Sequence, residues 1–88
     1  MYSRDMIIEN KTGLHARPAS SFVAAALKYK SEICVNKDSK KVSAKSIMNI
    51  LSLGASKGSK ITITAEGPDE EAAVMALCDL INSKFGEE

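Results

Sequence analysis

Several residue types that mark common functional classes are scarce in this chain of 88 residues. Tryptophan is absent and the other aromatic residues are few, so no platform for stacking nucleic-acid bases is visible. Acidic and basic residues nearly cancel to a formal net charge of +1, whereas nucleic-acid-binding domains usually carry a strongly basic face. The chain has a single histidine, and neither cysteine lies near it at the spacing of a metal site. These absences argue against a nucleic-acid-binding domain and a metalloprotein, and no cofactor is indicated.

Long apolar runs are also missing from the sequence. No stretch approaches the roughly 18 apolar residues that a membrane-spanning helix needs, and the charges of Arg4 and Asp5 come too early for a signal peptide. Cys34 and Cys78 lie far apart and form no C-x-x-C motif, so we interpret both as free, buried thiols in a reducing compartment. The sequence therefore predicts a cytoplasmic protein without membrane insertion.

The length and the hydrophobic patterning predict one α+β domain over residues 1–88. Residues 60–66 alternate apolar and polar, as in a strand with one buried face, and the helix that contains Pro18 has an apolar stripe of helical period. The element order is β-α-β-β-α-β-α, and such one-sided patterns indicate a sheet with helices packed on one face. The predicted strands are 2–8, 32–36, a short strand around Val42 after a turn over 37–41, and 60–66; the predicted helices begin near His15 or Ala16, run over 47–53, and run from Glu70 to Gly86, with Glu87 and Glu88 fraying.

The only histidine lies where the first helix is expected to begin. Proline is tolerated within a helix only in its first turn, so Pro18 places the helix start near His15 or Ala16. Backbone N–H groups point outward at that end, and the helix dipole presents about half a positive charge there. A cationic imidazole is disfavoured in that field, which predicts a neutral and nucleophilic His15 at neutral pH.

The neighbours of His15 fit an anion attached to its ring. The N-terminus of a helix is a ready site for phosphate, and the forked guanidinium of Arg17 suits phosphoryl oxygens. Gly13 permits the tight turn that would present the ring to a partner. Since the sequence indicates neither a general base nor a metal cluster, this set is what a covalent phosphoryl acceptor needs if a partner supplies the remaining chemistry. Spacing alone favours the simpler interpretation, a histidine N-cap beside a solvated arginine, because short motifs often match by chance.

A second feature is Ser46, which precedes the apolar helix expected over 47–53. Serine is a favoured N-cap, and a phosphate on it would be tolerated at a helix N-terminus, so a structural and a regulatory role are both open. Five of the seven residues from Ile47 to Leu53 are apolar, which is more than one buried face requires. We expect Met48 and Leu51 to stay exposed as a docking patch; the alternative is a short helix buried on two sides.

Together these residues resemble the histidine-containing phosphocarrier (HPr) family of the bacterial sugar phosphotransferase system. The family's active-site pattern of Gly, aliphatic, His, Ala or Ser, Arg, Pro, and Ala or Ser is matched from Gly13 to Ala19. Its second pattern, Lys-Ser followed by a mostly aliphatic helix and Gly, is matched from Lys45 to Gly54. Element order and length also agree, so the resemblance covers the whole chain. It implies an open-faced β-sandwich of four antiparallel strands with three helices on one side.

The resemblance also implies roles for individual residues. His15 would accept a phosphoryl group on Nδ1 from phosphorylated enzyme I, which takes it from phosphoenolpyruvate, and would pass it to the IIA components of sugar permeases. Arg17 and the backbone N–H groups of Ala16 and Arg17 would hold the phosphoryl oxygens. The chain would be a carrier and not an independent enzyme, and a monomer by default. Partners would dock through the first two helices, at Ser20, Ile47, Met48 and Leu51.

Regulation is implied at Ser46, which would be the site of HPr kinase/phosphorylase. The pair Ile47-Met48 resembles HPr from low-GC Gram-positive bacteria, where the serine-phosphorylated form also acts as a corepressor with catabolite control protein A. Lysines that some members carry on the first helix are absent, so the basic rim is expected from Arg17, Lys45 and Lys28. The alternatives within the family are a regulatory paralogue, which would lack the histidine, and a nitrogen-related phosphocarrier.

Overall fold

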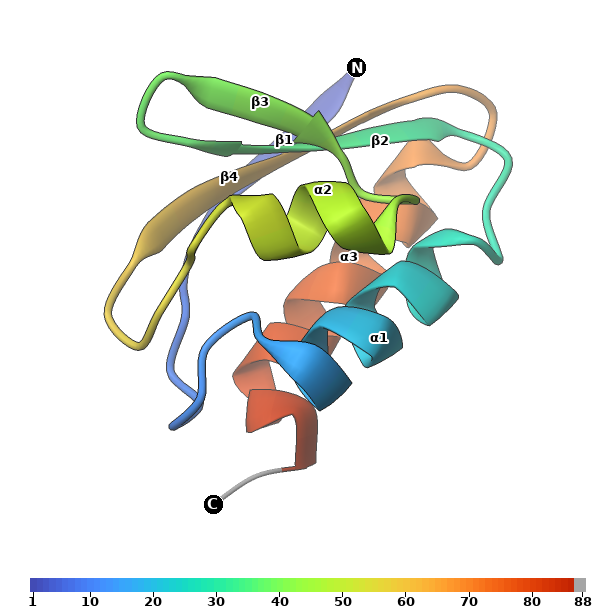
Figure 1. Cartoon of the computed structure of the whole chain (residues 1–88). Coiled ribbons are helices and arrows are strands. Elements are labelled where there is room, and N and C mark those ends of the chain that lie inside the picture. The colour runs from blue at the N-terminus through green and yellow to red at the C-terminus, as the bar shows by residue number, and fades with distance from the viewer. Residues whose placement is uncertain (87–88) are drawn as a thin grey trace.

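The structure is a computed structural model that describes residues 1–86. Its elements, in chain order, are β1 (Tyr2–Ile7), α1 (Ala16–Ala26), β2 (Glu32–Lys37), β3 (Lys40–Ser43), α2 (Ile47–Ser52), β4 (Lys60–Glu66), α3 (Glu70–Asn82) and a short 3-10 turn, η1 (Lys84–Gly86). The four strands form one antiparallel sheet in the order β1-β4-β2-β3, and the helices lie on one side of it (Figure 1). The predicted α+β open-faced sandwich is confirmed.

The central strand β4 shows why one face of the sheet is dry and the other is wet. Its alternating pattern buries Ile61, Ile63 and Ala65 and leaves Thr62 and Thr64 on the outer face, as the sequence predicts. β1 and β2 pair with β4 on its two sides, and β3 forms the edge beyond β2. The outer face of β4 is consequently polar, and the helices cover only the inner face of the sheet.

The three helices share one hydrophobic core with the sheet. α3 lies against β1, β4 and β2, α2 lies against β3, and α1 packs against both other helices (Figure 1). α1 contributes Phe22, Val23 and Ala26 to this core, at the spacing of its predicted apolar stripe. Packing therefore fixes the axis of α1, while His15 and Arg17 at its start stay exposed.

The hairpin of β2 and β3 is tighter than the predicted turn over 37–41. Both strands extend into that segment, so that only Asp38 and Ser39 remain between them, and Asp38 takes a positive φ of 56°. Lys40 lies in β3 and donates from Nζ to the carbonyl oxygen of Ser52, 2.8 Å away, at the end of α2. Lys37, Lys40 and Lys41, whose polar character suggests a turn, are thus paired residues of β2 and β3.

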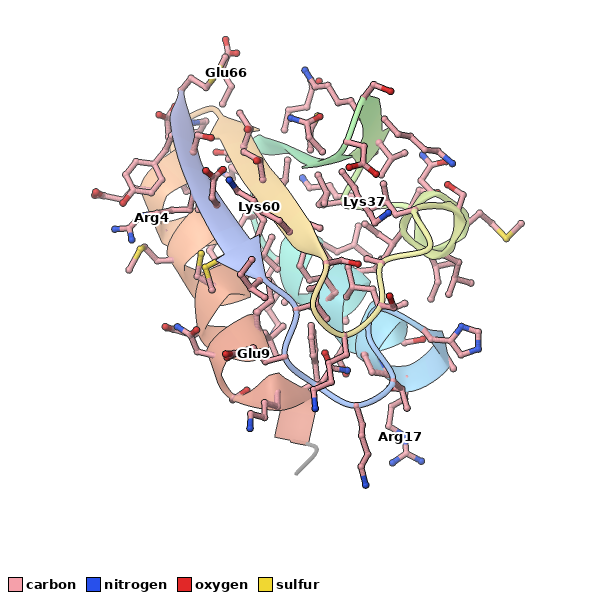
Figure 2. The ribbon with its side chains drawn as sticks, turned by 90° about the vertical axis from the view of Figure 1, so that its left-hand side faces the viewer. Arg4, Glu9, Arg17, Lys37, Lys60 and Glu66 are labelled. Atoms are coloured by element: carbon pink, nitrogen blue, oxygen red, sulfur yellow. The ribbon has the colours of Figure 1, made fainter. Side chains whose placement is uncertain are left out.

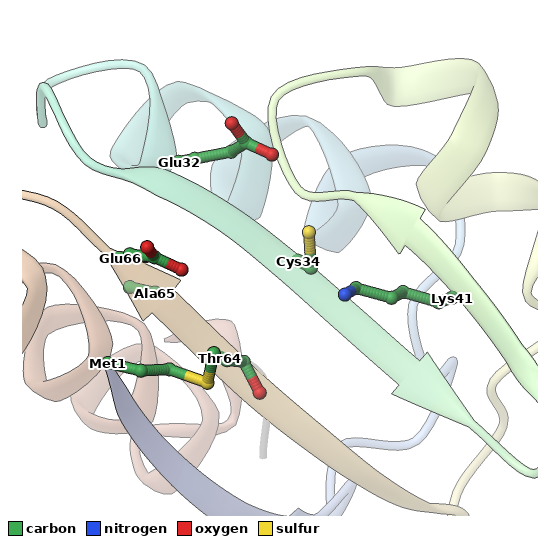
Figure 3. Close-up of a pocket in the computed structure, with 7 residues that line it drawn as sticks. All are labelled: Met1, Glu32, Cys34, Lys41, Thr64, Ala65 and Glu66. Atoms are coloured by element: carbon green, nitrogen blue, oxygen red, sulfur yellow. The ribbon is translucent and has the colours of Figure 1, made fainter.

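The prediction that both cysteines are buried is wrong for Cys34. Both are free thiols, and Cys78 is buried in α3, but Cys34 is only half-buried. It alternates with the buried Ile33 and Val35, so the two-residue period of β2 places it on the outer face, near the end of the Lys41 side chain (Figure 3). The register of the strand outweighs the usual burial of cysteine.

The last long helix also differs from its prediction, because α3 ends at Asn82 rather than at Gly86. Ser83 closes the helix, and the next two residues leave it with positive φ of 57° and 55°. The glycine that suggests a helix stop therefore lies inside a separate turn. The fraying expected for 87–88 falls outside the described residues.

Asp69 fixes the loop before β2 to the start of α3. Its carboxylate accepts hydrogen bonds from the Ser31 hydroxyl and from the backbone N–H groups of Lys30 and Ser31, the latter two at 2.9 Å. The Ser31 hydroxyl above all, together with these N–H groups, lowers the pKa of the Asp69 carboxyl from 3.8 to about 2. The ionised form of Asp69 is thus the form that the fold stabilises.

We expect Asp69→Asn to weaken the fold in a pH-dependent way, because the amide replaces a charged acceptor with a weaker one. A lowered folded-state pKa contributes stability above pH 3.8 that is lost as the pH falls through about 2. Urea unfolding at neutral pH should therefore show a clear deficit for the variant, and the deficit should shrink between about pH 4 and about pH 2. A deficit that stays constant over this range would contradict the assignment, and Ser31→Ala should behave in the same way with a smaller effect.

Candidate functional site

The loop before α1 contains a tight turn that Asn10 and Gly13 close. The Gly13 N–H donates to the carbonyl oxygen of Asn10 at 3.2 Å, and the buried Asn10 side chain donates from Nδ2 to the Gly13 carbonyl oxygen at 2.8 Å. Gly13 has a φ of +66°, in the left-handed region that glycine adopts without strain. The turn that the sequence predicts at Gly13 is confirmed.

This turn is held against the loop between α2 and β4. The Leu14 N–H donates to the carbonyl oxygen of Ala55 at 2.9 Å, and the Leu14 side chain is buried in the core. A β-carbon on Gly13 would lie 2.5 Å from the Ala55 oxygen and 2.6 Å from the α-carbon of Ser56, which is closer than real contacts allow. The backbone two residues before His15 is therefore fixed by a contact that only glycine permits.

His15 takes the N-cap position of α1, but its ring does not serve as the cap. Its φ of −127° and ψ of 155° are extended, its side chain is exposed, and that side chain makes no capping hydrogen bond. Pro18 lies within the first turn of the helix, where the sequence predicts it. Within residues 1–86, both ring nitrogens are thus left without a hydrogen-bond partner at the surface of the protein.

Two backbone donors at the start of α1 are unused. A helix leaves its first N–H groups without internal acceptors, but Pro18 has no N–H, and the Ala19 N–H reaches the His15 carbonyl oxygen at 3.3 Å. The N–H groups of Ala16 and Arg17 remain, and they have no acceptor among residues 1–86. They lie beside His15 at the positive end of the helix dipole, a setting that favours an anion.

Ala16 adopts an unfavourable backbone conformation directly after the histidine. Its φ is +33°, although residues other than glycine strongly prefer negative φ. A conformation of this kind costs an L-residue about 1–2 kcal/mol. It persists because the turn at Gly13 on one side and the packed helix on the other fix the path of the chain. No sequence pattern signals this feature.

His15 and Arg17 line a surface hollow of about 250 Å³. Arg17 extends away from the body of the protein, at the end opposite Glu66 (Figure 2). Phe85 and Gly86 of η1 line the same hollow. Sequence reasoning missed these two residues, because they lie at the other end of the chain and no local pattern links them to His15.

Ser46 is the N-cap of α2. Its hydroxyl oxygen accepts a hydrogen bond from the backbone N–H of Asn49 at 3.4 Å, so the predicted structural role is confirmed. Lys45, which we expect from the sequence on a basic rim with Arg17, donates from Nζ to the carbonyl oxygen of Tyr29 at 2.7 Å. Lys45 therefore joins the start of α2 to the segment after α1.

The exposed apolar residues of α2 form what we call the α2 patch: Ile47, Met48 and Leu51. Their exposed fractions are 37%, 74% and 37%, whereas Ile50 of the same helix is fully buried. The prediction that part of this helix stays exposed is confirmed, and a helix buried on two sides is excluded. Ser20 is exposed on α1, which packs against α2, so the predicted docking residues belong to two adjacent helices.

Other features that could form a site are separate from His15. A second hollow, of about 230 Å³, lies on the outer face of the sheet around Cys34 and does not include the histidine (Figure 3). Within residues 1–86, no three His, Cys, Asp or Glu side chains are grouped so as to hold a metal ion. In the same part of the chain, no helix is both long enough and apolar enough to cross a membrane.

A family model described as the PTS HPr component phosphorylation site, where PTS is the phosphotransferase system, matches residues 2–83. The chain belongs to the HPr family. Phosphocarrier protein HPr of Neisseria meningitidis serogroup A is 45% identical over 87 residues, which cover 99% of this chain and 98% of that protein. HPr is the phosphocarrier of the phosphotransferase system, and both sequence patterns that suggested this family lie within the matched segment.

Solved structures of HPr proteins have the same fold. HPr-C-His from Thermoanaerobacter tengcongensis is 60% identical with a TM-score of 0.98, covering 100% of this chain and 99% of that one. HPr from Bacillus anthracis is 45% identical with a TM-score of 0.89, covering 91% and 95%. Both are of the Gram-positive type that the sequence resembles. A second Thermoanaerobacter structure, 62% identical with a TM-score of 0.80 and covering 93% and 94%, is described as an HPr dimer.

We expect Gly13→Ala to destabilise the fold far more than the same substitution at Gly54. Both glycines have positive φ, but a β-carbon at Gly54 meets nothing within 4 Å, whereas one at Gly13 overlaps backbone atoms. The backbone penalty alone is about 1–2 kcal/mol at Gly54, and the overlap at Gly13 should raise the loss to about 3 kcal/mol or more. Free energies of unfolding from urea titration measure both, and equal losses at the two positions would show that the loop contact is not tight.

Proposed function

We propose that this chain carries a phosphoryl group on His15. The observation that most supports this is an exposed ring, without a hydrogen bond to residues 1–86, beside two unused backbone N–H groups. Phosphorylated enzyme I would be the donor. Nδ1 of His15 attacks the phosphorus atom, the bond to enzyme I breaks, and the phosphohistidine then passes its group to a IIA component of a sugar permease in the same way.

Three groups near His15 would stabilise the transferred phosphoryl group. The N–H groups of Ala16 and Arg17 are fixed by the backbone before any phosphoryl group arrives, so they stabilise its charge without rearrangement. The Arg17 guanidinium can pair with two phosphoryl oxygens at once. The chain supplies a nucleophile and an anion site while its partners supply the rest, so it is a relay and a substrate rather than an enzyme.

We expect His15→Ala to abolish phosphoryl uptake completely. The native chain, incubated with phosphoenolpyruvate and enzyme I, should gain one phosphoryl group that is labile in acid and stable in base, as phosphohistidine is. Arg17→Lys keeps the charge but loses the fork, so it should still be phosphorylated, at a lower rate. Mass spectrometry at high and low pH follows each species. If active enzyme I leaves the native chain unmodified, the carrier role is wrong and a regulatory binding protein is the better account.

Partner docking is proposed at the α2 patch together with Ser20. Apolar side chains with this exposure can be buried against enzyme I or a IIA component, and Arg17 adds a charge at the rim. We place this exchange in the cytoplasm and propose that the chain acts as a monomer. The dimer described for Thermoanaerobacter HPr is the alternative, and sedimentation equilibrium over a range of concentrations distinguishes the two.

Ser46 is proposed as a regulatory phosphorylation site for HPr kinase/phosphorylase. Its hydroxyl lies at the N-terminus of α2, next to Ile47 of the α2 patch. Phosphorylation would add about 1.5–2 negative charges at that point, where the helix dipole tolerates them. A partner that covers the patch would then have to desolvate the phosphate, while a partner with basic residues, such as catabolite control protein A, would gain an anchor.

We expect Ser46→Asp to slow phosphoryl transfer to His15, because it places a negative charge beside the α2 patch. Ser46→Ala is the matched control: it removes the cap at a cost of about 1 kcal/mol but adds no charge, so its transfer rate should stay near the native one. Initial rates with limiting enzyme I measure the effect, which should appear in KM. A native rate for Ser46→Asp, with unchanged folding, would contradict the proposed regulation.

A further inference from the structure

The hollow around His15 is bounded by two segments from opposite ends of the fold. One wall comes from Thr12 and from residues 15–18 at the start of α1. The other wall comes from Phe85 and Gly86 of η1. Among residues 1–86, Phe85 is the one phenylalanine, tyrosine or tryptophan that lines the hollow, and it lies beyond residues 2–83, which match the HPr family model. Its position there raises the question of what an apolar wall does beside a phosphorylated histidine.

The turn that carries Phe85 has a conformation that it would not adopt unaided. φ is positive at Lys84, Phe85 and Gly86, with values of 57°, 55° and 81°. Only the last of these residues is a glycine, so the first two are held in the left-handed region at a cost. The Gly86 N–H donates to the carbonyl oxygen of Ser83 at 3.1 Å, which closes the turn. Contacts outside the turn must therefore contribute to holding it.

Packing of Phe85 on α1 supplies such a contact. The ring centroids of Phe85 and Phe22 are 6.5 Å apart with the rings tilted by 50°, a favourable aromatic arrangement. Phe22 is fully buried, whereas Phe85 is only partly buried against the core and also lines the hollow. The same aromatic ring thus anchors η1 to the core and presents an apolar surface to the site.

An apolar surface matters here because a phosphohistidine has two possible acceptors. A partner protein can take the phosphoryl group, or a water oxygen can bond to the phosphorus atom while the P–N bond breaks. In the second case the ring nitrogen keeps the electron pair, takes up a proton, and inorganic phosphate leaves. The N–H groups and Arg17 stabilise the moving charge in both reactions, so they do not favour one over the other. Restricting the approach of water, in contrast, favours transfer to a partner over hydrolysis.

We propose that Phe85 restricts the approach of water to phosphorylated His15 and thereby lengthens the lifetime of the phosphohistidine. This inference rests on the proposed carrier function. The Phe85 ring has no polar atom that could hold the attacking water by a hydrogen bond. It also excludes water from one side of the hollow. The α2 patch is made of other residues on another helix, whereas Arg17, at the rim of the proposed docking surface, lines the hollow together with Phe85.

The test measures phosphate release from chains that have been phosphorylated by enzyme I and then separated from it. Phe85→Ala should release phosphate several-fold faster than the native chain, and Phe85→Leu, which keeps an apolar wall, should stay close to native. Leu80→Ala is the matched control, because Leu80 is also partly buried against the core but does not line the hollow. Transfer to a IIA component should proceed at the native rate in Leu80→Ala, because this control leaves the lining of the hollow unchanged.

Thermal unfolding checks that each variant is folded, and Phe85→Gln, which keeps most of the bulk but adds a polar end, replaces Phe85→Ala if that chain unfolds. Equal release from the native chain and from the folded Ala or Gln variant would overturn the inference. Equal acceleration in Leu80→Ala would also overturn it, because the effect would then be general loosening. A native chain that takes up no phosphoryl group overturns the carrier function as well, whereas normal uptake with equal release overturns this inference alone.

Discussion

The close contact between two loops is the constraint on which the rest of the site depends. Gly13 lies so near the backbone of Ala55 and Ser56 that no side chain fits, and the Leu14 N–H bonds to the Ala55 carbonyl. Only Leu14 separates this contact from His15, and α1 is itself packed against two helices. The backbone is therefore fixed both before and after His15, while the imidazole ring stays exposed. Because the backbone around His15 is already ordered, less conformational entropy is lost when a partner binds there.

This frame also explains two features that would be unstable in isolation. Ala16 keeps a positive φ because the backbone before and after it is fixed, and its N–H group lies next to that of Arg17 in the first turn of α1. η1 keeps its left-handed residues because Phe85 packs on Phe22. Rigid packing thus stabilises local conformations that are unfavourable by themselves, and both occur beside the histidine.

Much of the fold is predictable because its signals are local. The alternation of residues 60–66, the cap at Ser46 and the proline in the first turn of α1 each depend on a few neighbours in sequence. The position of Cys34 was also encoded, by its alternation with buried neighbours, but the usual burial of cysteine masked it. The strand order and the contact of Phe85 with the hollow depend on the folded chain, and no local pattern carries them.

The candidate site shows the same division between local and tertiary information. The histidine, the arginine and the helix start can be predicted from residues 13–19. The φ of Ala16, in contrast, depends on the packing of α1 and on the contact of Gly13 with Ala55, 42 residues further along the chain. Nuclear magnetic resonance of the ¹⁵N-labelled chain, before and after phosphorylation by enzyme I, tests the central claim most directly. The account predicts phosphorus coupling to the His15 ring and the largest amide shifts at Ala16 and Arg17. Coupling to another residue, or unshifted amides at these two positions, would contradict it.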